Sequence, residues 1–501
     1  MNRTTLSLIA AATTLAAVTG FAAATAPGTG GDDTAKAAAR LPVERSSLLC
    51  PAPSASDLAE TSYTSYTPVT TGSGSSGKAD LSPATRELAD GSAGGTGKGK
   101  AAKPVLSPGK PGQPVAGDAS GADSPALVGT AEGNLAPGWT VQQTTSVSAG
   151  TGRGLLGVNC SAPDTDFWFP GASTAKERSD YIHLTNPDDS AAVVDVQLYG
   201  PDGAIKSDVG EGIQVGPHSS VPVLLSTLTD KPQTNLTLHV TARSGRVAAA
   251  VLAADDKLGG DWLSPSADPA GTVVLPGIPK DATSVRLVVF APGDNDADLK
   301  LQLASANGRI TPAGHESLHV KSGMTTTVDL GDVTRGEAGS LVLSPTGDAV
   351  PVVAALRVVR GTGSNQETAF IPATRSVGER ATVADNRAKG STLSLTAPGE
   401  TGTVKVTASA GTEGGTPATK TYTVKAGTTV SVQPPAPTGL KGTYALTVEQ
   451  VSGGEVYGSR MLDVPDPGNP GLPMFTVQTL PDDRGMVSVP RADQDLSVLQ
   501  K

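Results

Sequence analysis

Three groups of residues have types and spacing that could support chemistry, and the first is a possible zinc site. The string His315-Glu316-Ser317-Leu318-His319 matches the H-E-x-x-H pattern of zinc peptidases. In those enzymes a helix places both imidazoles on one face, where they bind the metal while the glutamate activates water. Here residues 318–320 have the pattern of a strand, on which positions four apart are separated by about 13 Å. We therefore predict that His315, Glu316 and His319 are a coincidental match and bind no metal.

The second group is a cluster of carboxylates, Asp294-Asn295-Asp296-Ala297-Asp298, that resembles the start of a calcium-binding loop. Such a loop needs glycine at its sixth position and an acidic ligand at its twelfth. Leu299 and Ser305 occupy those positions. We expect a polar hairpin tip over Asp294–Asp298, with a weak calcium site as the alternative.

The third group is the pair of cysteines, Cys50 and Cys160, the only two in the chain. Their flanking sequences, LLCPAP at 48–53 and VNCSAP at 158–163, resemble each other, as expected for neighbouring strands of one domain. Export would place both thiols in an oxidising compartment, where a disulfide is favoured. We predict a Cys50–Cys160 disulfide; an intermolecular bridge or two unpaired thiols are the alternatives.

Two tryptophans are candidates for ligand contact, because Trp168 and Trp262 stand at the opening and the close of one predicted structural unit. Exposed aromatic rings can stack on sugars, but they more often fill the seam between neighbouring domains, which is the interpretation we favour. The sequence contains no G-x-S-x-G nucleophile motif. We predict no catalytic residues and no cofactor.

The elements that must position these residues begin after an N-terminal segment, residues 1–26, that has the layout of a secretory signal. Arg3 precedes an apolar stretch from Leu6 to Ala24 that ends in small residues. A retained membrane anchor is the alternative. The formal net charge of −10 argues against nucleic acid as a partner. We therefore expect a secreted or extracytoplasmic protein that contacts a membrane only through an uncleaved N-terminal segment.

Composition favours many short strands over helices. The chain has 501 residues, of which 60 are glycine and 39 proline, and only 37% are hydrophobic. Glycine and proline disfavour both helix and strand interiors, so they indicate turns. Residues 71–138 are so rich in Gly, Ser, Ala, Pro and Lys that we expect disorder there. This insertion would interrupt an N-terminal β domain at 27–165.

A threefold internal repeat follows. We place three units at 166–265, 272–362 and 368–465, with openings at Phe167–Gly171, Val274–Gly277 and Phe370–Ala373. Each unit shows about seven strand patterns with turn signals every 8 to 12 residues, which is typical of an Ig-like β-sandwich; a β-propeller is the alternative. Residues 466–501 should form a C-terminal hairpin that closes on the N-terminal domain. The predicted fold class is therefore all-β, with tandem Ig-like seven-stranded sandwiches and a long disordered insertion.

Several turn and core sequences carry a family resemblance. They are Leu184-Thr185-Asn186-Pro187, the GPDG turn at 200–203, the SGRVAAAV run at 244–251 and Asp261-Trp262. With these sequences the chain resembles an actinobacterial secreted family known only as a domain of unknown function, family 5719. The resemblance implies export and a β-rich fold. It supplies no catalytic residues.

The function most consistent with these features is a non-catalytic structural or binding role at the cell envelope. Repeated sandwiches without converging polar residues suit docking better than catalysis. An array of carbohydrate-binding modules on wall or capsule polysaccharide, contacting it through Trp168 and Trp262, is the first alternative. An extracytoplasmic hydrolase is the second. The expected partner is a protein or an envelope polysaccharide.

Overall fold

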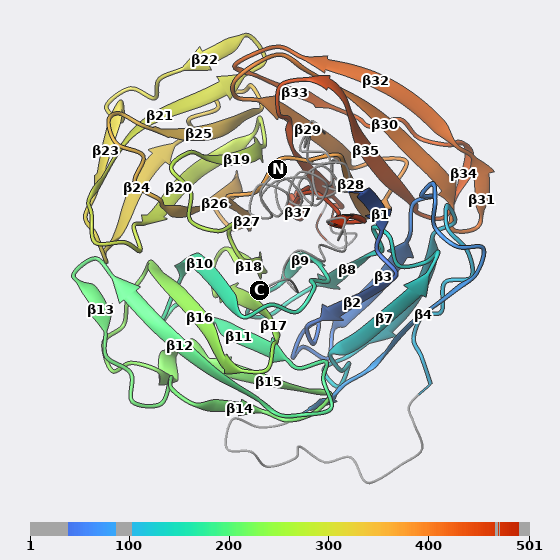
Figure 1. Cartoon of the computed structure of the whole chain (residues 1–501). Helices are drawn as coiled ribbons and strands as arrows, with labels where there is room; N and C mark the ends of the chain where they lie inside the picture. The colour runs from blue at the N-terminus through green and yellow to red at the C-terminus, as the bar shows by residue number, and fades with distance from the viewer. Residues whose placement is uncertain (1–38, 87–102, 466–468, 470, 490–501) are drawn as a thin grey trace, which may run out of the picture. The chain divides into compact units, whose positions relative to one another are not determined.

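The structure is a computed structural model that describes residues 39–86, 103–465, 469 and 471–489. It forms two compact units, of which the larger spans Pro42–Val487. The described residues of the smaller unit belong to β1 (Ala39–Pro42) and β38 (Met486–Val489), which pair with each other. The chain is all-β, as expected, with strands along all of its described length (Figure 1). The predicted signal, residues 1–26, lies outside the described residues.

The part of the chain that the structure describes contains no helix long and apolar enough to cross a membrane. Its helical structure is limited to the 3-10 turn η1 (Leu225–Thr227). The larger unit instead folds into four successive β-sandwiches, each made of two sheets that share one apolar core.

The first sandwich contains the segment that we expected to be disordered. One sheet has the order β2 (Arg45–Cys50), β7 (Leu127–Gly133), β4 (Gly77–Pro83), and the other has the order β6 (Val115–Ser120), β3 (Ala59–Tyr66), β8 (Thr140–Val147), β9 (Gly154–Asn159). The prediction of disorder over 71–138 is thus wrong for four strands, β4, β6, β7 and the short β5 (Thr85–Arg86), whereas its residues 87–102 lie outside the described part.

Small inward-facing residues explain why composition predicted disorder where these strands form. Ala79 and Ala131 are buried in its core, and a Cβ added at Gly129 would lie 2.6 Å from the ring of Trp139. The two sheets therefore pack closely around alanine and glycine, which contribute little to the hydrophobicity of the segment.

The second sandwich begins with the predicted opening strand. Its first sheet contains β10 (Asp166–Ala172), β16 (Leu236–Ser244), β12 (Ala192–Gly200), β13 (Gly203–Ile205) and β14 (Ile213–Val215). Its second sheet contains β18 (Gly259–Leu263), β17 (Ala248–Asp255), β11 (Tyr181–Thr185), β15 (Ser219–Leu224) and β5 (Thr85–Arg86).

The third sandwich has the same plan. Its first sheet contains β19 (Val273–Ile278), β25 (Gly339–Pro345), β21 (Ala297–Ser305), β22 (Gly308–Ile310) and β23 (Ser317–Val320). Its second sheet has the order β24 (Thr325–Gly331), β20 (Ala282–Phe290), β26 (Val353–Thr362), β27 (Asn365–Pro372). Because β27 pairs with β26, Phe370–Ala373 lies at the end of the third sandwich. The prediction that these residues open the next unit is therefore wrong.

The fourth sandwich ends the larger unit. Its first sheet contains β28 (Arg380–Asn386), β35 (Tyr444–Gly453), β30 (Gly402–Gly411), β31 (Gly414–Thr416), β32 (Ala418–Val424) and β34 (Thr438–Lys441). Its second sheet has the order β33 (Thr428–Val432), β29 (Ser391–Ala397), β36 (Tyr457–Asp463), β37 (Phe475–Thr479). The expected hairpin of β37 with β38 does not form, since β37 pairs with β36 and β38 pairs with β1.

One pairing scheme is common to all four sandwiches, so the described chain contains a fourfold repeat where the sequence indicated a threefold one. The first sheet pairs β2–β7–β4 in the first sandwich and β10–β16–β12, β19–β25–β21 and β28–β35–β30 in the others. The second sheet ends in a strand, here called the closing strand, which is β9, β18, β27 or β37. These seven shared strands form the common frame of each sandwich.

The four closing strands bring the sandwiches of the larger unit together. β9 contacts β18, β18 contacts β27, β27 contacts β37, and β37 contacts β9. The contacts therefore form a closed cycle, in which the last sandwich touches the first. The segments that follow the closing strands meet at one place, and the candidate site is there.

Candidate functional site

The predicted disulfide is present and borders this site. Cys50 and Cys160 are bonded, with their Cα atoms 4.4 Å apart. Cys50 ends β2 and Cys160 follows β9, so the bond joins the first and closing strands of the first sandwich. Directly beside it, the Leu49 amide donates to the Ser161 carbonyl, and the Ser161 amide donates back to the Leu49 carbonyl.

Both candidate stacking tryptophans are buried at seams between sandwiches. The Trp168 ring lies 5.5 Å from that of Phe290 in the third sandwich and stacks on His239 at 3.6 Å. Trp262 packs against Ala59 and Val158 of the first sandwich. The side chains are 7% and 2% exposed, so neither offers an open ring face to a sugar.

The H-E-x-x-H residues lie on a strand and its preceding turn. His319 belongs to β23, and its Nδ1 atom is 2.8 Å from Asp298 Oδ1. Its Nε2 atom is 3.4 Å from Asp296 Oδ2, so the imidazole lies against the Asp294–Asp298 hairpin tip. Glu316 accepts a hydrogen bond from the Gly314 amide. The hydrogen bond that the imidazole donates to the Asp298 carboxylate raises the pKa of His319.

His319 is thus an ion-pair partner of Asp296 and Asp298 in the hairpin tip. Over the described ranges, no three His, Cys, Asp or Glu residues gather closely enough to hold a metal ion. His315 makes none of the contacts that connect His319 to Asp296 and Asp298.

A cavity of about 840 Å³ lies where the four closing strands end, inside the Pro42–Val487 unit. The four segments that follow these strands all line it, namely residues 159–164, 264–268, 373–375 and 481–484. Strand β2 and the start of β17 are among the other elements that line it. Loops clustered at one end of a rigid scaffold are a common place for binding residues.

Each of these four segments is held by a backbone hydrogen bond to the first strand of its own sandwich. The bonds are Ser161 to Leu49, Ser266 to Trp168, Thr374 to Val274 and Asp483 to Arg380, each from the amide of the first residue to the carbonyl of the second. The same backbone hydrogen bond therefore recurs at the cavity in all four sandwiches, and its donor is serine twice, threonine once and aspartate once.

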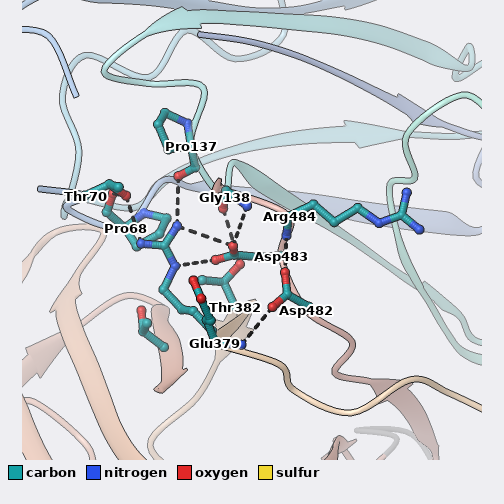
Figure 2. Close-up of polar contacts among 12 residues, drawn as sticks. Pro68, Thr70, Pro137, Gly138, Glu379, Thr382, Asp482, Asp483 and Arg484 are labelled. Atoms are coloured by element: carbon teal, nitrogen blue, oxygen red, sulfur yellow. Dashed lines mark hydrogen bonds and ion pairs between the residues drawn. The ribbon is translucent and has the colours of Figure 1, made fainter. Parts of the chain in front are cut away.

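The fourth segment also ties the fourth sandwich to the first. The Arg380 guanidinium donates to Asp483 at 2.5 Å, to Thr70 Oγ1 at 2.8 Å and to the Pro137 carbonyl at 3.4 Å. The Thr382 hydroxyl donates to the Gly138 carbonyl at 3.3 Å. Asp483 lies between the chain at Gly138 and Thr382 (Figure 2). Together these bonds fix one wall of the cavity.

Most charged side chains of the cavity are already paired. Arg246 bonds both carboxylate oxygens of Asp188, and Arg375 bonds Asp268. Arg484 differs: it is exposed and makes no ion pair with the described residues. Its side chain points away from Asp483 (Figure 2), so its guanidinium is available to a ligand.

The backbone presents Arg484 in an uncommon conformation. Its φ is +51°, in the left-handed region that non-glycine residues rarely adopt. The Asp482 carboxylate stabilises the turn, because it accepts hydrogen bonds from the Arg484 amide at 2.7 Å and the Glu379 amide at 2.9 Å.

Two buried carboxyl groups lie among the closing strands. Asp261 of β18 accepts hydrogen bonds from the Gly157 amide of β9 at 2.9 Å and from the Thr476 hydroxyl of β37 at 3.0 Å. Burial raises its pKa well above the ordinary range. Glu367 of β27 lies 2.8 Å from Arg153, yet burial outweighs that cation and raises the pKa of Glu367 to about 9.

Sequence reasoning missed the residues that build this site. Arg380, Asp483 and Arg484 stand in segments with no recognised motif, and Glu367 lies in a polar run before the supposed opening of a unit. The one usable signal was the similarity of the sequences around Cys50 and Cys160, which marks the end of a first strand and of a closing strand.

Comparison with known proteins gives a family and no activity. No curated protein matches the sequence. The model of a family described only as a family of unknown function, DUF5719, matches residues 115–435. The match starts inside the first sandwich, at β6, and ends after β33 of the fourth. Since it covers more than half of the chain, the protein belongs to the DUF5719 family of unknown function.

Proposed function

We propose that this protein is a non-catalytic binding protein that works outside the cytoplasm and takes its ligand in the cavity at the ends of the closing strands. One observation carries the proposal: loops from all four sandwiches line a single cavity of about 840 Å³. That volume is in the range of ligand sites, roughly 300–1,000 Å³.

The pairing of the cavity carboxylates with arginine side chains supports a binding role over a catalytic one. Asp188, Asp268 and Asp483 are each paired with an arginine. A general acid or base needs a carboxyl group that can exchange its proton with substrate near the working pH. The carboxylate oxygens of these residues are engaged by arginine side chains, so these residues serve better as supports for the loops.

The lining favours a polar ligand. Serine, threonine, aspartate and arginine side chains, together with alanine and proline, make up most of the cavity wall, and the nearby aromatic residues Trp139 and Phe167 are buried. The proposed ligand is a polar polymer of the cell envelope, either a protein or a polysaccharide. The net charge of −10 disfavours nucleic acid.

The Cys50–Cys160 disulfide supports the proposed location. Disulfides persist in oxidising compartments and are rare in the cytosol. Export would bring the protein to the envelope polymers that we propose as ligands.

Binding of purified envelope polysaccharide and envelope proteins to the oxidised full chain tests this proposal. We expect Arg484→Glu to weaken binding at least tenfold. Arg335→Glu is the matched control, because Arg335 is also exposed, also has a positive φ, of 46°, and does not line the cavity. Equal binding by both variants would contradict the proposal.

A further inference from the structure

The edge of β2 that faces the cavity has unpaired backbone groups. β2 is at the edge of its sheet and pairs only with β7. In an antiparallel pair, successive residues alternate between bonding the partner strand and pointing away from it. Leu49 points away from β7, because both of its backbone groups bond Ser161. With the regular register of β2, Ser47 and Arg45 must point the same way.

Both ends of this edge are already paired, and its middle is not. At one end the Val43 amide donates to the Gly485 carbonyl at 3.0 Å, and at the other end Leu49 bonds Ser161. Among the described residues, the outward amide and carbonyl groups of Arg45 and Ser47 have no such partner. Arg45–Leu49 line the cavity, so these groups face its interior.

The second and third sandwiches show which chain segment pairs with the equivalent edge. Four residues before Trp168, Asp164 exchanges two backbone hydrogen bonds with Val247, which directly precedes β17. Four residues before Val274, Ala270 exchanges two with Val352, which directly precedes β26. In both cases the residue just before the neighbouring strand pairs with this position of the outward edge, in a single β-bridge.

The first sandwich lacks this pairing. The residue four positions before Leu49 is Arg45, and the residue preceding β8 is Trp139. The Trp139 amide donates to the Ala136 carbonyl at 3.2 Å, within its own turn, and so does not reach Arg45. A pairing position that is filled internally in the second and third sandwiches is therefore open among the described residues of the first, on the wall of the cavity of about 840 Å³.

The geometry points to β-strand addition: an extended polypeptide segment of a partner protein binds in the cavity by pairing with Arg45 and Ser47 of β2. This deepens the proposed function, on which it rests, by naming the ligand as polypeptide. Main-chain groups spaced as in a strand match another extended backbone, whereas a polysaccharide does not carry alternating amide donors and carbonyl acceptors.

A display library of random linear heptapeptides, selected on the oxidised full chain, tests this inference. Selected peptides are resynthesised with acetylated and amidated ends, and their affinities are measured. Ser47→Pro removes the outward amide, at a position where an edge strand tolerates proline. We expect it to weaken binding at least tenfold, and Ser47→Ala, which keeps the amide, to weaken binding less than twofold.

Thr272→Pro is the matched control, because Thr272 stands two residues before Val274, as Ser47 stands two before Leu49, and does not line the cavity. N-methylated peptides give a second measurement that does not depend on a folded variant. Methyl groups on alternate amides in one frame should abolish binding, and in the other frame binding should persist, because only one peptide edge pairs with β2.

Two results would overturn the inference: no peptide is enriched over a protein-free surface, or the enriched peptides bind Ser47→Pro as tightly as the unaltered chain. If a polysaccharide then binds in an Arg484-dependent way, the proposed function stands and strand addition fails. If neither ligand class binds, both fail.

Discussion

Arg380 and Asp483 form an ion pair that joins the first strand of the fourth sandwich to the segment after its closing strand. Cys50 and Cys160 join the equivalent places in the first sandwich through a disulfide. By their backbone bonds Arg380 and Asp483 correspond to Leu49 and Ser161, so the side-chain cross-links of the first and last sandwiches lie one residue apart in the repeat. The Arg380 guanidinium also reaches Thr70 and Pro137, so it holds the first and fourth sandwiches together.

Arg380→Met should lower the free energy of unfolding by about 3 kcal/mol, because it leaves the buried Asp483 carboxylate without its cation. Urea-induced unfolding followed by fluorescence measures the change. The control is Lys405→Ala, which removes an exposed ion pair with Glu449 and should cost less than about 1 kcal/mol. A similar loss for both variants would show that Arg380 does not stabilise this wall.

Reducing the disulfide should also destabilise the chain. Cys50 and Cys160 are 110 residues apart in sequence, so the bond restricts a long loop in the unfolded state. The expected loss is about 2–5 kcal/mol. The double variant Cys50→Ala/Cys160→Ala should unfold at a lower urea concentration and no longer respond to reductant. An unchanged midpoint would mean that the backbone bonds of Leu49 and Ser161 are sufficient.

Stability should fall as the pH rises, because of Glu367. Its folded-state pKa is about 9, above its ordinary value of 4.5. Between these two values the folded chain keeps a proton that the unfolded chain releases, so raising the pH favours unfolding by up to about 1.4 kcal/mol per unit. Urea midpoints from pH 5 to 9 measure this slope.

Glu367→Gln should flatten the pH dependence, because the amide does not titrate. Glu449→Gln, at a more exposed strand position, serves as control and should keep the slope of the unaltered chain. A slope that survives Glu367→Gln unchanged would assign the pH dependence to another group, with Asp261 the next to test.

Gly157→Ala should weaken the contact between β9 and β37. A Cβ at this position would lie 2.3 Å from Gln478 Nε2 and 2.6 Å from Thr476 Oγ1, so the closing strands must move apart. The expected cost is about 1–3 kcal/mol. Gly399→Ala is the control, since nothing lies within 4 Å of the added carbon. Equal melting temperatures would show that the strands can separate freely.

Turn chemistry made much of the fold predictable. Strand patterns separated by turns rich in proline and glycine predicted the all-β class and most strands of the later sandwiches, and the similar sequences around Cys50 and Cys160 predicted the disulfide. An N-terminal β domain was predicted, but its strands within 71–138 were missed because several of their inward positions hold alanine and glycine, such as Ala79 and Gly129, whose burial depends on the partner sheet.

The site was beyond the reach of sequence patterns for a different reason. Arg380 and Asp483 are 103 residues apart, and Asp261 and Thr476 are 215 apart. Each is ordinary in its local sequence and becomes part of a site only when the closing strands meet. Phe370–Ala373 was wrongly predicted to open a unit because a closing strand and an opening strand share the same short apolar pattern before proline.

The contact between β37 and β9 makes assembly depend on the whole chain. Tyr66 and Thr447 share a hydrogen bond although they are 381 residues apart in sequence. Asp261 can accept the hydrogen bond of the Thr476 hydroxyl only after the last closing strand has been added. During synthesis or export, the surface of the early sandwiches that β37 will contact therefore stays exposed to solvent and to proteases until this last closing strand has formed. Resistance to proteolysis would then indicate that the whole chain has been synthesised and exported. A row of independent domains without this closing contact would give no such indication.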